Sequence, residues 1–280
     1  MLLFELLLAI GASLCYGFSD YLAGLLSRKR GPLEGLLAFC LFALPVFLLA
    51  IPFSPLPWPP SLEMVLLFLF FAICYLAGYA LFFRALEKGS LAIVSPLSAI
   101  WPLITVSLAM LFLGERPSSL QLLGAGVLVV GTVLAGIDWR SASKTRWVAG
   151  ALDAVGAALL WGISLGVAKP LVLAWGPLLP ALFLFIFMTL ALYIFLRPPL
   201  SRIRSSLDPV AAGAGILIAF GWLAANTAVQ TVPVSLLSPI SATYPLVTIA
   251  LAYSRLGERP QPLQWFGIAL AIAGVALVSL

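Results

Sequence analysis

Long apolar runs separated by short polar breaks are the main pattern of this sequence. A helix needs about 20 mostly apolar residues to cross the hydrocarbon core of a bilayer. The runs that reach or approach this length predict spans at residues 3–26, 33–52, 63–84, 90–113, 118–137, 147–172, 177–196, 209–231, 234–254 and 262–280. The Pro-rich stretch from Pro52 to Pro60 is expected to be a non-helical link, because proline lacks a backbone N–H donor. The pattern predicts an all-α integral membrane protein with ten transmembrane helices.

Composition supports the membrane interpretation. Hydrophobic residues form 63% of the 280 residues and charged residues 9%. Soluble domains average about 45–50% apolar residues and about 25% charged residues. The first run carries Glu5 and has no basic segment before it, so we expect a retained helix rather than a signal peptide. The chain has no histidine, and Cys15, Cys40 and Cys74 lie far apart in apolar runs. This distribution predicts no metal site, redox motif, disulfide or cofactor.

The basic residues predict an orientation. Of the 15 Lys and Arg residues, 13 follow the first, third, fifth, seventh and ninth predicted spans. They form short clusters between apolar runs rather than one continuous face, which disfavours a nucleic-acid partner. Positively charged loops stay in the cytoplasm. We therefore expect both termini outside the cell membrane, and the segment 139–146 to be a cytoplasmic linker.

The chain also repeats itself. The segment from Ser95 to Leu134 matches the segment from Ser238 to Leu277 without a gap, with about half of the positions identical. Residues from Ala9 likewise match residues from Ala154. The halves 1–138 and 147–280 each carry five predicted spans, so the second half enters the membrane from the opposite side. Such inverted-topology repeats place a substrate site near the midplane between the halves.

Several motifs occur in both halves. A Tyr/Trp-Gly-x-Ser motif, a Ser-Pro…Trp/Tyr-Pro helix, a Gly-Glu-Arg turn and a Gly-rich last helix occur in each half. Together they resemble the EamA-type repeat of the drug/metabolite transporter superfamily. The resemblance implies a ten-helix basket with a central cavity lined by the first, third and fourth helices of each half. It also implies secondary transport, often export, of metabolites, amino acids or drugs. Members are commonly described with cytoplasmic termini, opposite to the orientation that the charges favour here.

Acidic residues inside predicted spans are candidates for function, because burying a charge in a bilayer is costly. Asp20 and Asp153 each lie about 9 Å from the predicted cytoplasmic end, at about 1.5 Å per residue. We take them as proton- or cation-coupling candidates that would share a proton. Alternatively, each faces cytoplasmic water or caps a neighbouring helix. The small multidrug members carry a Glu where this chain has Leu14 and Leu159, so simple Glu-based proton exchange is not expected. Glu5 and Lys169 would either pair as an outer gate or lie at the membrane interface.

Aromatic residues recur at matched positions in the two halves, and they would line a cavity or pack helices together. The candidate cavity residues are Tyr16, Ser19, Tyr79, Ser98, Trp101, Trp161, Ser164, Trp222, Asn226, Ser241 and Tyr244. Four prolines, Pro96, Pro102, Pro239 and Pro245, interrupt two of the predicted spans. They would either expose backbone groups to a substrate or shape the packing as plain kinks.

Two further motifs have local explanations. The Gly-Glu-Arg-Pro sequences at Gly114 and Gly257 suit a helix end followed by a new helix, whose N-terminus Glu115 or Glu258 would complement. The Gly-x-Ser-x-Gly sequence from Gly162 to Gly166 lies inside a predicted span, in a chain without histidine. It therefore does not predict a hydrolase, and the chain shows no other constellation typical of an enzyme.

The sequence thus favours a secondary transporter that moves a small metabolite, an amino acid or an amphiphilic compound, across the cytoplasmic membrane. The transport mechanism would be alternating access around a central cavity, and export is the expected direction. The expected partners are a small-molecule substrate and the lipid bilayer. Because both halves lie in one chain, a monomer is expected rather than an obligate dimer. The alternative is a non-transporting membrane protein, either a lipid-handling accessory or a scaffold.

Overall fold

The computed structural model describes residues 3–54, 61–89, 91–136, 150–199, 201, 208–256 and 262–279, and all of the regular structure in these ranges is helical. The linker 139–146 and the second Gly-Glu-Arg-Pro sequence lie outside the described residues. The helices are α1 (Leu3–Arg30), α2 (Pro32–Ala50), the short 3₁₀ helix η1 (Ile51–Phe53), α3 (Leu62–Lys88), α4 (Leu91–Ser98), α5 (Pro102–Phe112), α6 (Ser119–Gly136), α7 (Ala151–Gly166), α8 (Ala168–Trp175), α9 (Leu179–Leu196), α11 (Pro209–Val229), α12 (Val234–Ser241), α13 (Tyr244–Leu256) and α14 (Pro262–Ser279).

Many of these helices are long and apolar enough to cross a bilayer. Within the described residues, seven helical stretches meet that test, including one made from α4 and α5 and one made from α12 and α13. Helices α7 and α8 are long and apolar enough to cross the bilayer only when taken together, and they meet at a bend of 44°. Helices α6 and α14 contain shorter apolar stretches, Ser119–Leu134 and Trp265–Val278. The protein is therefore built as a multi-pass helical membrane protein.

Three of the predicted continuous spans are interrupted. Pro102 begins α5 after the three-residue break that follows α4, and Pro245 lies in the first turn of α13, directly after the break that follows α12. Pro102 and Pro245 thus lie at breaks, whereas the other two kink candidates, Pro96 and Pro239, lie inside α4 and α12. The bend between α7 and α8 at Val167 was not predicted. Its physical cause is Pro170, which has no N–H to donate to the carbonyl of Gly166 one turn earlier.

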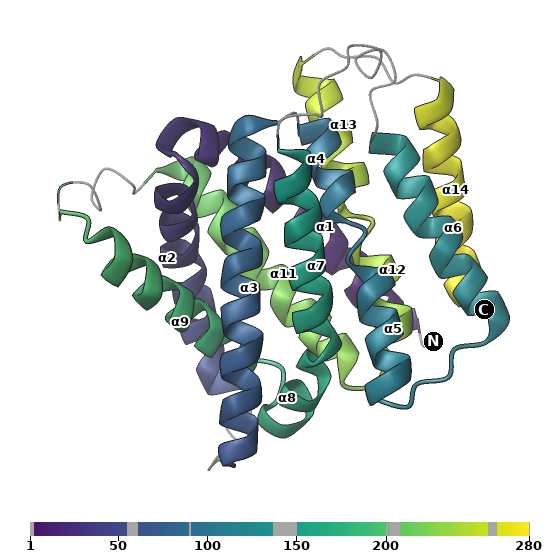
Figure 1. Ribbon diagram of the computed structural model, residues 1–280, viewed down its shortest axis with the longest axis horizontal. Helices are drawn as coiled ribbons and strands as arrows, with labels where there is room; N and C mark the ends of the chain where they lie inside the picture. Colours follow the sequence, from purple (N-terminus) through teal and green to yellow (C-terminus); the bar gives the residue numbers. More distant parts are fainter. Residues whose placement is uncertain are drawn as a thin grey trace.

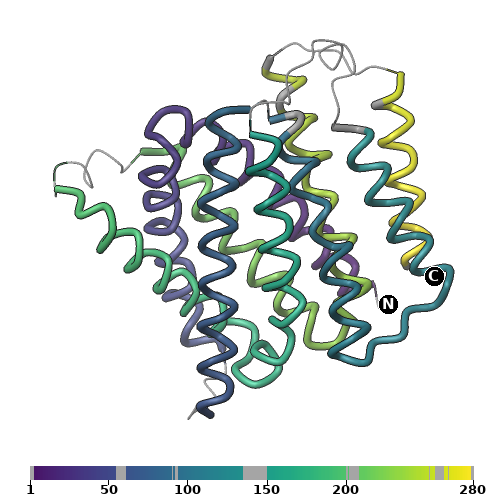
Figure 2. The backbone as a smooth tube through the Cα atoms, viewed as in Figure 1, coloured from purple at the N-terminus to yellow at the C-terminus, as the bar shows by residue number. Residues whose placement is uncertain are grey.

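The two halves pack in a reciprocal way. Helix α1 packs against α11 and α3 against α7, so the first helix of each half contacts the third helix of the other. The second helices, α2 and α9, pack together, and so do the last helices, α6 and α14. Figures 1 and 2 show α6 and α14 side by side at one edge of the bundle, and α9 leaning away at the opposite edge. This reciprocal pairing is what two repeats related by a two-fold axis produce.

Two glycines allow close helix crossings between the halves beside the cavity. A Cβ at Gly17 of α1 would lie 2.5 Å from the carbonyl oxygen of Tyr244, and one at Gly162 of α7 would lie 2.8 Å from that of Trp101. Each glycine carbonyl also accepts a hydrogen bond from a threonine of the opposite half. Thr248 donates to Gly17 at 3.1 Å and Thr105 to Gly162 at 3.0 Å. Small residues of this kind let membrane helices approach closely.

The two ends of the bundle differ in charge. Both termini lie at the lower end in Figure 1, which we call the termini end. Helices α1, α3 and α13 finish at the opposite end with Arg28–Arg30, Lys88 and Arg255 in their last turns, and we call this the basic end. Ion pairs join helices across the halves here. Asp208 pairs with Lys29 at 2.8 Å and with Arg30 at 3.2 Å, so α1 is tied to α11.

Candidate functional site

A cavity lies between the two halves, with walls from α1, α3, α5, α7, α8, α11, α12 and α13 and from Trp101 in the break that precedes α5. Its volume is about 100 Å³, counted as the space open to the centre of a water molecule. Most of its surface is apolar, which suits a small organic molecule. Nine of the predicted functional residues lie on its wall: Tyr16, Asp20, Tyr79, Trp101, Trp161, Trp222, Asn226, Ser241 and Tyr244.

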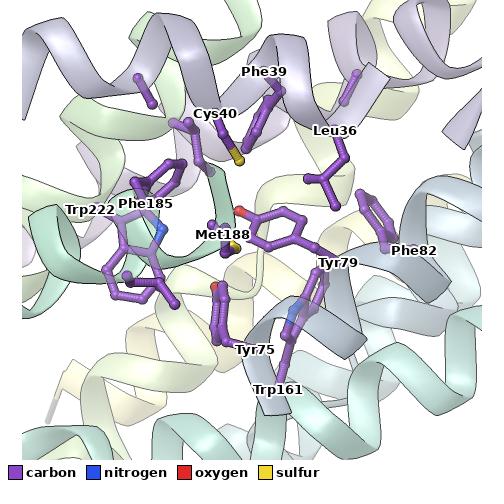
Figure 3. Close-up of a cluster of buried hydrophobic side chains, with 14 of the residues drawn as sticks. Leu36, Phe39, Cys40, Tyr75, Tyr79, Phe82, Trp161, Phe185, Met188 and Trp222 are labelled. Atoms are coloured by element: carbon purple, nitrogen blue, oxygen red, sulfur yellow. The ribbon is translucent and has the colours of Figure 1, made fainter. Parts of the chain in front are cut away.

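Aromatic rings form one side of the cavity, and the sequence reasoning missed the residue at their centre. The Tyr75 ring lies 5.1 Å from that of Trp222 and 5.2 Å from that of Tyr79, centroid to centroid, and it stacks on Trp161 at 6.0 Å. Figure 3 shows these rings facing one another from three helices. Tyr75 lies one turn before Tyr79 on α3, so it shares that helix face. This spacing was the signal that would have identified it.

Asp20 contributes the only carboxylate among the described residues that line the cavity. It is only 8% exposed, and within the described part of the chain no hydrogen bond or ion pair reaches it. It lies close enough to interact electrostatically with the hydroxyls of Tyr16, Tyr79 and Tyr244. A buried carboxylate without a partner is costly, so this position favours a proton or a cationic group as its partner.

Asp153 lies in different surroundings. It is absent from the cavity wall and sits in the first turn of α7, at the basic end. Lys88 of α3 pairs with it at 2.9 Å, and Arg84 approaches to 3.6 Å. The structure therefore does not place the two acids as a pair sharing a proton. Instead Asp153 ties α3 to α7 as Asp208 ties α1 to α11.

Three predicted cavity residues lie behind the wall instead of on it. Ser19 donates to the carbonyl of Ala214 at 2.8 Å and so joins α1 to α11. Ser164 donates to the carbonyl of Trp161 at 3.1 Å within α7. Ser98 is hydrogen-bonded to the hydroxyl of Tyr244 at 2.7 Å. Ser98 thus supports a wall residue, whereas the other two serve helix packing or the helix backbone.

Polar contacts also fix the wall on α11. The Asn226 amide donates to the carbonyl of Pro177 at 2.8 Å, which anchors the connection between α8 and α9. Asn226 still lines the cavity, together with Ala225 and Val229 of the same helix. Ser238 and Ser241 of α12 have hydroxyl groups that are buried and without a partner in the described structure. These groups are available to a bound molecule, since both serines line the cavity.

The termini end of the cavity corrects two sequence expectations. Lys169 does not pair with Glu5; its ammonium lies 2.9 Å from Glu115. Glu5 instead accepts a hydrogen bond from Thr231 at 3.4 Å. Glu115 was expected to complement the following helix, α6, but it accepts hydrogen bonds at 2.9 Å from the backbone N–H groups of Val234 and Ser235 in α12. Sequence reasoning could not find this contact because it joins residues about 120 positions apart.

Helix α6 has its own cap, which explains why Glu115 is free to reach across. The Ser118 hydroxyl accepts from the N–H of Gln121 at 3.2 Å, and the Gln121 side chain accepts from the N–H of Ser118 at 2.9 Å. This reciprocal pair is a capping box. Gly114 ends α5 with a φ of 64°, a conformation that glycine adopts readily. No cluster of metal-ligating side chains occurs among the described residues.

Comparison with known proteins agrees with this architecture. A protein of Streptantibioticus cattleyicolor named "Probable terminal-alkyne amino-acid exporter" is 29% identical over 220 residues, covering 74% of this chain and 72% of that protein. An uncharacterised protein of Methanocaldococcus jannaschii is 40% identical over 67 residues, covering 24% of this chain and 49% of that protein. A crystal structure with 19% identity has a TM-score of 0.72, covering 98% of this chain and 95% of the other, and supports the fold alone. The EamA-like transporter family model matches residues 3–137 and 148–280, so the chain belongs to that family.

Proposed function

We propose that this protein is a secondary transporter that exports a small amino-acid-like or amphiphilic metabolite by alternating access. The observation that carries the proposal is the cavity between the halves, which has aromatic walls and, among the described residues, the carboxylate of Asp20 without a partner. A lipid-handling accessory or scaffold would need no such cavity. The named exporter of S. cattleyicolor supports an amino acid as the substrate and export as the direction. We propose no enzymatic activity.

We further propose ten spans, with each broken pair counted as one and with α6 and α14 as the fifth and tenth. The halves 1–138 and 147–280 then form two inverted five-helix units joined by a linker at 139–146. Basic loops stay in the cytoplasm, so the basic end faces inward and the termini end outward across the cell membrane. The helices of both halves already pack reciprocally within one chain, and this supports a monomer as the working unit.

Within the cavity, we propose that aromatic rings hold the apolar part of the substrate and that Asp20 is the coupling residue. An ammonium group over aromatic faces gains attraction from the rings, and Asp20 offers it a carboxylate. The same carboxylate would carry a proton when the substrate is absent. Asp153 was the other coupling candidate, but its two cationic partners favour a structural role.

The test measures charge movement in proteoliposomes as solid-supported-membrane currents. A panel of amino acids, including L-propargylglycine as a terminal-alkyne amino acid, is applied with and without a pH gradient. We expect a substrate-evoked current that depends on pH in the wild type and in Asp153→Asn, and a current without pH dependence, or none, in Asp20→Asn. Loss of coupling in Asp153→Asn with Asp20→Asn unaffected would assign the role to Asp153 instead. Silence of the wild type for every compound, in both electrical and isotope-exchange assays, would contradict transport of this class.

A further inference from the structure

One ion pair joins the two halves at the termini end of the cavity. The Glu115 carboxylate lies on the connection between α5 and α6, in the first half, while its three hydrogen-bond donors lie in the second half. Lys169 of α8 donates to one carboxylate oxygen at 2.9 Å, and the same oxygen accepts from the N–H of Val234. The other oxygen accepts from the N–H of Ser235. Glu115 therefore holds α8 and the start of α12 together.

The pair is well shielded from water. The Glu115 side chain is 8% exposed and that of Lys169 is 19% exposed. Burial alone would raise the pKa of Glu115, but the hydrogen bonds from Lys169 and from the residues at the start of α12 outweigh it and lower the pKa. Glu115 is therefore ionised at neutral pH, and the contact with Lys169 is a charged pair. Hydrogen bonds between ionised groups are stronger than neutral ones.

Lys169 also belongs to the cavity. It lines the wall with Val172 of its own helix and with Val229, Val234 and Leu237 from the neighbouring helices α11 and α12. Among the described residues on that wall it is the only cationic side chain. A carboxylate that enters the cavity thus meets one cation, and that cation is already bound to the same chemical group on Glu115. The two carboxylates would compete for it.

We propose that Lys169 binds the carboxylate of the transported molecule and that this carboxylate replaces Glu115, which opens the termini end. The proposal rests on the proposed function and names a carboxylate-bearing substrate. The exchange keeps one ion pair on Lys169, so no charge is left unpaired on α8. Glu115 then keeps only its two backbone hydrogen bonds to α12, and α8 is no longer tied to the α5–α6 connection. Substrate arrival and opening are thereby linked through one lysine.

The binding test uses purified protein in detergent and the fluorescence of the cavity tryptophans. L-leucine, L-phenylalanine and L-propargylglycine are titrated, each beside its amide, which keeps the amine and lacks the carboxylate. In Lys169→Met we expect the preference for acid over amide to fall about tenfold, the equivalent of about 1.4 kcal/mol. Lys169→Arg keeps the charge and should keep the preference. Glu115→Gln removes the competitor and should tighten binding of the acids alone.

The opening test does not depend on transport. In a background with Cys15, Cys40 and Cys74 changed to Ala, Leu237→Cys places a thiol on the cavity wall. A membrane-impermeant thiol reagent is applied from the side of the termini. We expect faster labelling in Glu115→Gln, and in the parent on addition of an acid but not of its amide. Arg116→Gln, which removes a neighbouring exposed charge, is the matched control and should leave labelling unchanged.

The outcomes separate this proposal from the proposed function. Acid-selective binding and labelling that both depend on Lys169, in a protein that moves no substrate, would support the ion-pair exchange and reject transport. Measured transport with an unchanged acid-to-amide preference in a folded Lys169→Met would overturn the exchange and leave transport intact. Failure of the wild type to bind any of the three acids would also overturn it.

Discussion

At the residue scale, the repeated Tyr/Trp-Gly-x-Ser motif has a packing explanation. Its glycine, Gly17 or Gly162, lies where the first helix of one half crosses the broken helix of the other. The residue before it, Tyr16 or Trp161, lines the cavity, while Ser19 and Ser164 make hydrogen bonds behind the wall. The motif therefore places an aromatic side chain on the cavity and lets the backbones approach beside it.

The first prediction at this scale concerns Gly17→Ala. Its new Cβ would lie 2.5 Å from the carbonyl oxygen of Tyr244 and from the Cβ of Val247. Overpacking of this kind costs about 1–3 kcal/mol, so we expect a lower midpoint of thermal unfolding in detergent, followed by circular dichroism. Gly11→Ala on the same helix is the control, because a Cβ there meets nothing within 4 Å. Equal midpoints for the two variants would contradict the close crossing.

At the element scale, acidic residues at the basic end fix how helices of opposite halves meet. Asp208 caps α11 by accepting from the N–H groups of Val210 at 2.8 Å and Ala211 at 3.1 Å. It also pairs with Lys29 and Arg30 at the end of α1. Asp153 makes the corresponding contact between α3 and α7. Each pair joins the third helix of one half to the first helix of the other.

The second prediction compares Asp208→Ala with Asp208→Asn. Asparagine keeps an oxygen that caps the helix but removes the charge, whereas alanine removes both. Loss of an N-cap costs about 1 kcal/mol, and this corresponds to a drop of about 2–4 °C in the thermal midpoint for a chain of this size class. We therefore expect the alanine variant to unfold at a temperature lower than the asparagine variant by about that amount. The difference in thermal midpoint between wild type and Asp208→Asn measures the contribution of the ion pairs.

The pH dependence of stability tests whether the ion pairs of Asp208 contribute through its charge. Burial alone would raise the pKa of Asp208, but hydrogen bonds from Lys29, Arg30 and the α11 backbone outweigh it and hold the pKa well below its usual range. The stabilisation is therefore complete above the unfolded-state pKa of about 3.9 and is lost as pH falls towards the lower folded-state pKa. The gap between wild type and Asp208→Asn should shrink below about pH 4. A gap that stays constant down to pH 3 would contradict the ionic origin.

The sequence predicted elements better than it predicted contacts between them. The positions of Pro102 and Pro245 indicated two helix breaks, because a missing N–H acts locally. The α7–α8 bend at Pro170 is equally local and was overlooked inside an apolar run. Glu115 and Lys169 could not be paired from the sequence, since their contact depends on how the halves fold onto each other. Ser19 shares a motif with the wall residue Tyr16, yet its hydroxyl donates to the Ala214 carbonyl of α11 and does not line the cavity.

At the scale of the whole molecule, the fold separates three structural features along one axis. The ion pairs of Asp208 and Asp153 lie at the basic end, the aromatic cavity lies between the halves, and the Glu115–Lys169 pair lies at the termini end. Rocking of one half against the other would break contacts at one end while keeping those at the other. The two ends differ, because the Glu115–Lys169 pair adjoins the cavity and the basic-end pairs do not. A substrate in the cavity would therefore act on the contacts at the termini end.

The last prediction is the orientation of this axis in the membrane. Because basic ends stay in the cytoplasm, we expect both termini of the chain to be outside. The measurement places an epitope tag at each terminus and, separately, a cysteine at Ser143 in the predicted cytoplasmic linker, and tests accessibility in intact cells. Both tags should be accessible and the cysteine protected. Protected tags with an accessible linker would instead support the orientation common in the superfamily. The Glu115–Lys169 pair would then control entry from the cytoplasm, and a carboxylate that displaces Glu115 would open the route for loading rather than for release.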